Sequence, residues 1–200
     1  PGSFIEVAET AGLLSGIFEV IFPQILAQVQ SWQEGQAEGP PIFINVNLSR
    51  GQIRDPHLVE RIDAMMTENP VQPFTLGFEL TESMMVDDQA VLATLRALKA
   101  RDIRLLLDDF GTGYSSLANL KNYPIDSLKV DRSFLRELGT SGDNTEIVRA
   151  IVSLAHSMRM EVTVEGIESE NQLRFVTGLG CEYGQGFYFA PALDVDAASL

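Results

Sequence analysis

The sequence has little cysteine and little histidine. Its 200 residues include one cysteine, Cys181, and two histidines, His57 and His156. A single cysteine excludes an internal disulfide framework and a zinc site built from several thiolates, and it fits a reducing, cytoplasmic compartment. Neither histidine stands at the end of a predicted strand or beside a nucleophile motif, so we expect both to be structural.

Positive charge is also scarce. The 14 Lys and Arg residues face 28 Asp and Glu residues, which leaves a net charge of −14, and no run of basic residues occurs. This composition argues against a protein that holds DNA or RNA by neutralising many phosphates. A small anionic substrate would need a metal ion or a few well-placed cations.

Long uninterrupted hydrophobic runs are absent from the sequence. The most apolar long stretch, residues 12–32, contains Ser15, Glu19 and several glutamines. These polar positions favour an amphipathic helix over a membrane span, so we expect no membrane contact from this chain.

What is present is enough for one domain with a sizeable core, since 45% of the residues are hydrophobic. Short apolar segments alternate with helical patterns, which predicts βα units and a parallel sheet in an α/β fold over residues 1–200. The predicted strands are residues 42–48, 74–81, 103–108, 127–131, 161–165 and 186–189. The predicted helices are residues 16–32, 56–68, 88–101, 144–159 and 169–178.

Alternation within these strands favours a barrel over an open sheet. Val46 and Leu48 share one face while Asn45 and Asn47 share the other, and the predicted strands 74–81, 127–131 and 161–165 repeat this pattern. A doubly wound sheet would be apolar on both faces, whereas a TIM-type (β/α) barrel can direct a polar face toward its mouth. Because such a barrel normally has about eight strands, we expect about two N-terminal strands to be missing from this chain.

The segment 105–116 carries the sharpest local signal. An apolar run, Leu105 to Leu107, is followed by Asp108, Asp109 and two nearby glycines, as expected for a buried strand that ends in a flexible turn. Two adjacent carboxylates at a strand end can hold a divalent cation, or they can cap the turn that follows. Neighbouring strand residues point to opposite faces, so a shared site requires the regular strand to stop there.

Other polar residues stand at the ends of the predicted strands. In a barrel these ends converge on one mouth, which would gather Asn47, Glu79, Asp108, Asp109, Lys129, Asp131 and Glu165. Five carboxylates beside one lysine favour one or two divalent cations, and ligands made only of oxygen favour magnesium or manganese. Taken singly, each of these residues could instead be an ordinary capping, solvated or surface-paired side chain.

Several ordered motifs resemble the EAL-domain family of cyclic di-GMP phosphodiesterases. They are residues 4–14, Val-Asn-Leu-Ser (46–49), Glu-Leu-Thr-Glu-Ser (79–83), Asp-Asp-Phe-Gly-Thr-Gly-Tyr-Ser-Ser-Leu (108–117), residues 128–134, Val-Glu-Gly-Ile-Glu (164–168) and residues 180–187. The resemblance covers essentially the whole chain. It implies a modified TIM barrel and hydrolysis of cyclic di-GMP to linear pGpG with two Mg²⁺ or Mn²⁺ ions, in a bacterial signalling protein.

The resemblance also implies a position for each functional residue. Asn47, Glu79 and Asp108 match ligands of a first metal ion, and Asp108, Asp109 and Glu165 match those of a second. Lys129 matches a lysine that holds the attacking water, and Glu82 matches a glutamate that steadies the loop after the two aspartates. Asp131 and Gln185 match further site residues that contact substrate, and residues 110–120 match a gating loop that forms a homodimer.

Two departures from the family pattern bear on activity. The Glu-Ala-Leu segment is not found, which removes one metal-binding glutamate, and residues 190–192 lack a basic residue common there. We therefore expect a domain incomplete at its N-terminus whose activity is impaired in this fragment. The alternative is an inactive EAL module that serves as a cyclic di-GMP receptor or a protein-interaction domain.

Overall fold

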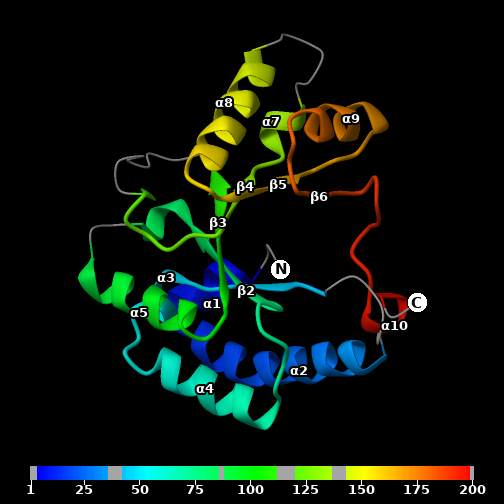
Figure 1. The fold of residues 1–200 in the computed structure, drawn as a ribbon. Coiled ribbons are helices and arrows are strands. Elements are labelled where there is room, and N and C mark those ends of the chain that lie inside the picture. Colours follow the sequence, from blue (N-terminus) through cyan, green and yellow to red (C-terminus); the bar gives the residue numbers. More distant parts are fainter. Residues whose placement is uncertain (1–3, 36–41, 86–87, 112–119, 137–142, 199–200) are drawn as a thin grey trace. The chain divides into compact units, whose positions relative to one another are not determined.

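The computed structural model describes residues 4–35, 42–85, 88–111, 120–136 and 143–198 (Figure 1). Helices and strands alternate along the chain, which agrees with the predicted α/β class. In order they are α1 (Ile5–Thr10), α2 (Leu14–Gly35), β1 (Ile44–Asn47), α3 (Arg50–Ile53), α4 (Leu58–Glu68), β2 (Leu76–Thr81), η1 (Glu82–Met84), α5 (Gln89–Lys99), β3 (Arg104–Phe110), β4 (Ser127–Val130), α7 (Ser133–Arg136), α8 (Asp143–Ser157), β5 (Glu161–Glu165), α9 (Glu170–Gly178), β6 (Tyr183–Gln185) and α10 (Val195–Ala198).

The strands form a six-stranded sheet in the order β1-β2-β3-β4-β5-β6. Pairing is parallel between β1 and β2, between β3 and β4, between β4 and β5, and between β5 and β6. The chain divides into two compact units. The first comprises Pro1–Leu80 and Asp87–Leu105, and the second comprises Thr81–Val86 and Leu106–Leu200.

Helix α2 in the first unit confirms the amphipathic reading of residues 16–32. It buries Phe18, Phe22, Leu26 and Val29, which recur every three or four residues and so lie on one face. The Phe18 and Phe22 rings stack with centroids 4.6 Å apart, and Phe22 lies 5.8 Å from the ring of Phe78 on β2. Among the described helices, none is both long and apolar enough to cross a membrane.

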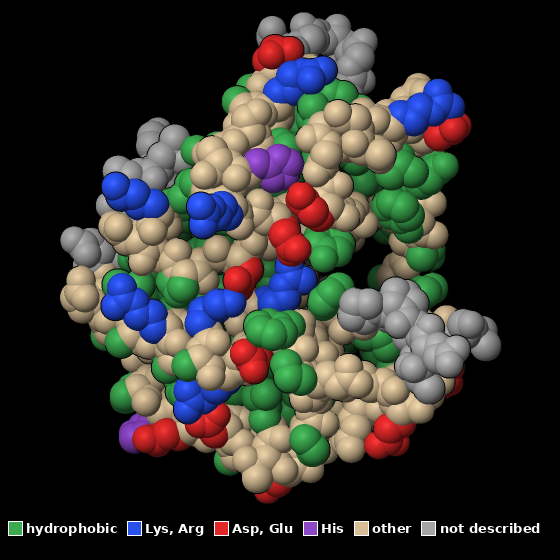
Figure 2. All heavy atoms as spheres, viewed as in Figure 1, with side chains coloured by type: hydrophobic (Ala, Val, Ile, Leu, Met, Phe, Trp, Pro, Cys, Tyr) green, Lys and Arg blue, Asp and Glu red, His purple; other side chains and the backbone are tan. Residues whose placement is uncertain are grey.

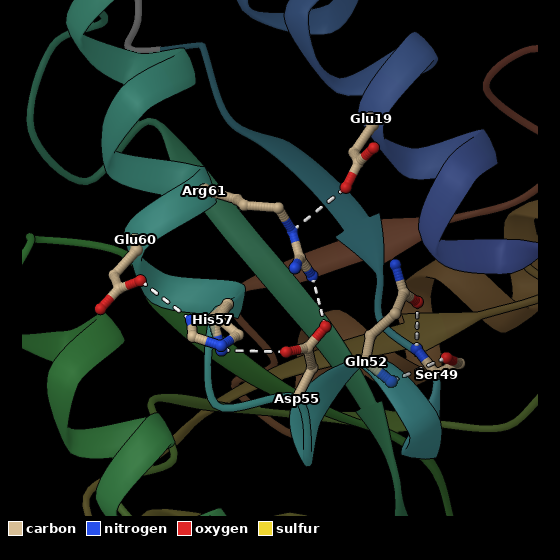
Figure 3. Close-up of polar contacts among 7 residues, drawn as sticks. All are labelled: Glu19, Ser49, Gln52, Asp55, His57, Glu60 and Arg61. Atoms are coloured by element: carbon tan, nitrogen blue, oxygen red, sulfur yellow. Dashed lines mark hydrogen bonds and ion pairs between the residues drawn. The ribbon is translucent and has the colours of Figure 1, made fainter.

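Charged side chains of the first unit are paired locally, as the close-up in Figure 3 shows for the start of α4. The Arg61 guanidinium lies 3.3 Å from Glu19 on α2 and 2.7 Å from Asp55. His57 Nδ1 lies 3.1 Å from Glu60 in the same network. On the face drawn in Figure 2, basic side chains are likewise interspersed with acidic ones.

Capping boxes begin two of the helices. Ser49 and Gln52 form one at α3, and Ser169 and Gln172 form the other at α9. In each, the serine hydroxyl accepts from the backbone N–H three residues on, while the glutamine side chain accepts from the serine N–H. The box at α9 stands at the start of the predicted helix 169–178, where Ser169 and Gln172 have the spacing typical of this motif.

The core of the second unit lies between β3–β5 and the helices packed on them. Helix α8 contacts β4 and β5 (Figure 1) and buries Val148, Val152 and Ala155. The facing strand residues are Leu107, Leu128, Val130, Val162 and Val164, all fully buried. Because side chains alternate along a strand, the positions between these apolar residues point to the other face of the sheet.

The last predicted strand, residues 186–189, was wrong: the observed strand lies just before it in the sequence. Residues 186–189 form a turn, and the strand is β6, Tyr183–Gln185. Ile167 determines this position, because its N–H donates to the Gln185 carbonyl at 3.0 Å and its carbonyl accepts from the Tyr188 N–H at 2.9 Å. The aromatic run at 187–189 is typical of a strand, yet Phe187 is 74% exposed.

Candidate functional site

A bulge at the end of β3 brings two adjacent aspartates to one site. Leu107 pairs with Leu128 but Phe110 pairs with Val130, so three steps along β3 match two along β4. Within this bulge Asp109 has a φ of 53°, a left-handed conformation that is uncommon outside glycine. The regular strand is thus interrupted where a shared site requires it.

Glu165, the last residue of β5, completes an acidic cluster with these two aspartates. One carboxylate oxygen from each of Asp108, Asp109 and Glu165 lies within 4.8 Å of the other two. Asp109 is exposed, and the other two are half-buried. Three oxygen donors at this spacing can hold one divalent cation.

Lys129 on β4 lies beside the acidic cluster and is almost completely buried. Its Nζ is 3.0 Å from Asp108 Oδ1 and 2.7 Å from Glu165 Oε1. Only 4% of the residue is exposed, so these ion pairs form away from bulk water. The alternation of β4 accounts for this orientation, because Leu128 and Val130 point into the apolar core and Lys129 points to the opposite face.

The charges of the cluster are not balanced by Lys129 alone. Although Asp109 is exposed, partial desolvation of its carboxyl raises its pKa, and the carboxylates of Asp108, Asp131 and Glu165 raise it further, while Lys129 acts in the opposite direction. A raised pKa means that the ionised form is disfavoured there. An additional positive charge would relieve this repulsion.

Asp131 and Ser133 form a turn beyond β4. Burial would raise the pKa of Asp131, but hydrogen bonds from the Ser133 hydroxyl and backbone hold it below its ordinary value. The Ser133 N–H donates to Asp131 Oδ1 at 3.0 Å. Sequence reasoning missed Ser133, although an aspartate two residues before a serine is a recognisable turn signal.

Glu82 and Gly111 tie the end of β3 to η1. Glu82 is 9% exposed, and its Oε2 accepts a hydrogen bond from the Gly111 N–H at 3.3 Å. Gly111 has a φ of 93°, and a Cβ there would lie 3.0 Å from the Phe134 ring. This segment therefore needs glycine both for its backbone conformation and for space.

Three other predicted residues lie on strands: Asn47 ends β1, Gln185 ends β6, and Glu79 lies within β2. In the first unit Asn47 on β1 and Glu79 on β2 are register partners, and the Leu48 N–H donates to the Glu79 carbonyl at 3.0 Å. In the second unit Gln185 on β6 is the register partner of Glu165. The structure therefore places Asn47 beside Glu79 in the first unit. In the second unit it places Gln185 beside Glu165 of the acidic cluster.

The predicted dimer contact through residues 110–120 stays a prediction. Residues 112–119 lie outside the described residues. Phe110, the first residue of this range, is 6% exposed and belongs to the core of the second unit. Leu120 is also buried in that core.

A sequence model of the EAL domain matches residues 1–192. MucR of Pseudomonas aeruginosa, a bifunctional diguanylate cyclase/cyclic di-GMP phosphodiesterase, is 39% identical over 94% of this chain and 27% of that protein. The signaling protein YkoW of Bacillus subtilis is 34% identical over 95% of this chain and 24% of that protein. The chain thus spans about a quarter of the length of such curated relatives.

Solved structures agree with this match. The PaMucR phosphodiesterase in complex with c-di-GMP has a TM-score of 0.92 and 36% identity, and the match covers 99% of this chain and 80% of that one. The EAL enzyme Bd1971 with cAMP bound has a TM-score of 0.94 and 27% identity, with 100% and 56% covered. These similarities confirm the predicted fold class.

Proposed function

Because this chain belongs to the EAL domain family, we propose that it is the catalytic domain of a metal-dependent phosphodiesterase that hydrolyses cyclic di-GMP to linear pGpG. The observation that supports this most is the cluster of Asp108, Asp109 and Glu165 beside the buried Lys129. The similarity to MucR supports the choice of substrate, since that relative is a cyclic di-GMP phosphodiesterase.

The donor set of the acidic cluster fits a divalent cation. All three ligand atoms are carboxylate oxygens, which suit Mg²⁺ or Mn²⁺ better than zinc. The raised pKa of Asp109 agrees with this, because burial and neighbouring carboxylates disfavour its charge and a bound cation would favour it. We assign one ion to Asp108, Asp109 and Glu165; a second ion, with Asn47 and Glu79 among its ligands, rests on the family resemblance.

The chemistry that such an ion supplies is acidification of a water molecule and stabilisation of negative charge on the phosphate. Lys129 orients the Asp108 and Glu165 carboxylates through its two ion pairs. An ammonium group has three donors, so Lys129 can also hold the attacking water. Glu82 steadies the end of β3 through its hydrogen bond with the Gly111 N–H. We assign Asp131 and Gln185 to substrate positioning, as the family resemblance implies.

The direct test is product analysis with the purified protein of natural length. Cyclic di-GMP incubated with Mn²⁺ or Mg²⁺ should give pGpG, and chelation of the metal should stop the reaction. Binding of cyclic di-GMP without hydrolysis at either metal would identify the inactive receptor instead. If the protein neither binds nor hydrolyses cyclic di-GMP, the proposal is rejected.

A matched pair of variants tests the assignment of Glu165. Glu165→Gln removes one carboxylate of the cluster and should lower turnover by at least about 100-fold. Glu168→Gln makes the same change at an exposed residue of the following loop and should leave turnover near that of the wild type. Equal turnover for both variants would contradict the assignment of Glu165.

A further inference from the structure

Arg132 lies at the margin of the acidic cluster because of a close contact with Gly166. Arg132 follows Asp131 beyond β4, and Gly166 follows Glu165 at the end of β5. A Cβ on Gly166 would overlap the Arg132 Cβ and lie 3.1 Å from its Cα. Gly166 also has a φ of 73°, so glycine permits both the backbone turn and the approach of Arg132.

The Arg132 guanidinium is available for an anion. The residue is exposed, and in the described part of the chain its guanidinium makes no hydrogen bond or ion pair. It is close enough to Asp131 that its charge helps to lower the pKa of that carboxyl, after the effects of burial and of the Ser133 hydrogen bonds. By contrast, Lys129 is buried and already engaged by Asp108 and Glu165.

We propose that Arg132 binds the phosphate of cyclic di-GMP that is not cleaved. This inference rests on the proposed function. Cyclic di-GMP carries two phosphodiesters, each with one negative charge, and only one of them can react at the acidic cluster. The other must be held near a surface rich in carboxylates, where it would be repelled without a cation. A guanidinium offers two parallel N–H donors to phosphate oxygens, a geometry that lysine lacks.

The position of Arg132 predicts an effect on substrate binding rather than on the chemical step. Contact with an unreacting phosphate is the same in the ground state and in the transition state, so it changes KM and leaves kcat alone. Loss of a hydrogen bond to a charged group corresponds to about a 10- to 100-fold change. Arg132→Gln should therefore raise KM by about this factor, and Arg132→Lys should raise it less.

The experiment compares Arg132→Gln and Arg132→Lys with Arg136→Gln, which removes an exposed arginine on α7. Steady-state kinetics with Mn²⁺ give kcat and KM for each protein. Calorimetric titration with cyclic di-GMP, with Ca²⁺ in place of Mn²⁺, gives affinity without reliance on turnover. Titration with pGpG adds a second probe, since this product retains the uncleaved phosphodiester.

We expect Arg132→Gln to weaken binding of both ligands in parallel with its rise in KM, and Arg136→Gln to match the wild type. An unchanged KM and affinity in Arg132→Gln would overturn this inference and leave the proposed function intact. A fall in kcat at unchanged KM would also overturn it, because Arg132 would then act on the reacting phosphate. A wild-type protein that neither binds nor hydrolyses cyclic di-GMP would overturn both.

Discussion

Two aspartates of the first unit, Asp55 and Asp63, lie in surroundings opposite to those of Asp109 in the second unit. Hydrogen bonds from the His57 backbone and the Arg61 side chain lower the pKa of Asp55. A hydrogen bond from Arg101 lowers the pKa of Asp63. In the second unit, burial and neighbouring carboxylates raise the pKa of Asp109.

This difference is the one expected between carboxylates paired for stability and carboxylates of a candidate functional site. In the first unit each of these carboxylates has its own donor, so its ionised form is favoured and the pair adds modestly to stability. In the acidic cluster three carboxylates share one ammonium, and at least one of them is disfavoured as an anion. Carboxylates with raised pKa values in such clusters mark functional sites more often than structural ones.

The largest expected effect is that of Lys129→Met. It removes the only described cation paired with Asp108 and Glu165 and leaves buried negative charge without compensation. Breaking a buried ion pair in this way costs about 3–5 kcal/mol. Urea unfolding without divalent cations should show this loss, while Lys121→Met at an exposed position should show almost none. Equal stability of the two variants would mean that the cluster needs no counter-charge.

Asp108→Asn should affect activity most among the conservative changes. It removes one carboxylate of the cluster and one partner of Lys129, so Mn²⁺-dependent hydrolysis should fall at least about 100-fold while circular dichroism stays unchanged. Asp63→Asn, the same substitution in the first unit, should keep nearly full turnover. Wild-type turnover in Asp108→Asn would remove the distinction between the two sets of aspartates.

Gly186→Ala tests how tightly the backbone beside the cluster is packed. A Cβ at Gly186 would overlap the backbone N and O of Ile167, which bonds to Gln185 and Tyr188. We expect a loss of about 1–3 kcal/mol in the free energy of unfolding, as for overpacking. Gly178→Ala in α9 has open space around it and should be neutral or stabilising. A neutral Gly186→Ala would show that this connection can move.

The smallest expected effect concerns the Asp63–Arg101 pair and pH. Asp63 has a lowered folded pKa, so its contribution to stability is present above its ordinary pKa of 3.8 and is lost as pH falls through the folded value. Both side chains are partly exposed, so the contribution is about 0.5–1 kcal/mol. The difference in unfolding free energy between wild type and Asp63→Asn should be measurable at pH 7 and should shrink below pH 4. A difference that is constant with pH would contradict the electrostatic origin.

Much of the fold follows from local patterns in the sequence. Five predicted strands overlap β1–β5. Four of them alternate apolar and polar residues, and the fifth, residues 103–108, is a short apolar run followed by glycines. The helix capped by Ser169 was also predicted. Its capping box can be recognised in the sequence because Ser169 and Gln172 are only three positions apart. The acidic residues of the cluster were identified because each stands at or next to the end of a strand.

Only tertiary structure decided how these residues meet. Asp108 and Asp109 share a site because the pairing of β3 with β4 shifts between Leu107 and Phe110. Lys129 is buried because it pairs with Asp108 and Glu165, which lie on other strands. The position of β6 depends on hydrogen bonds between Ile167 and residues 185 and 188. The sequence by itself determined which polar residues lie near the ends of β1–β5, since the local pattern of apolar and polar residues locates each strand. Register, close backbone approach and ion pairing depend on contacts between separate strands, so the sequence pattern could not specify them.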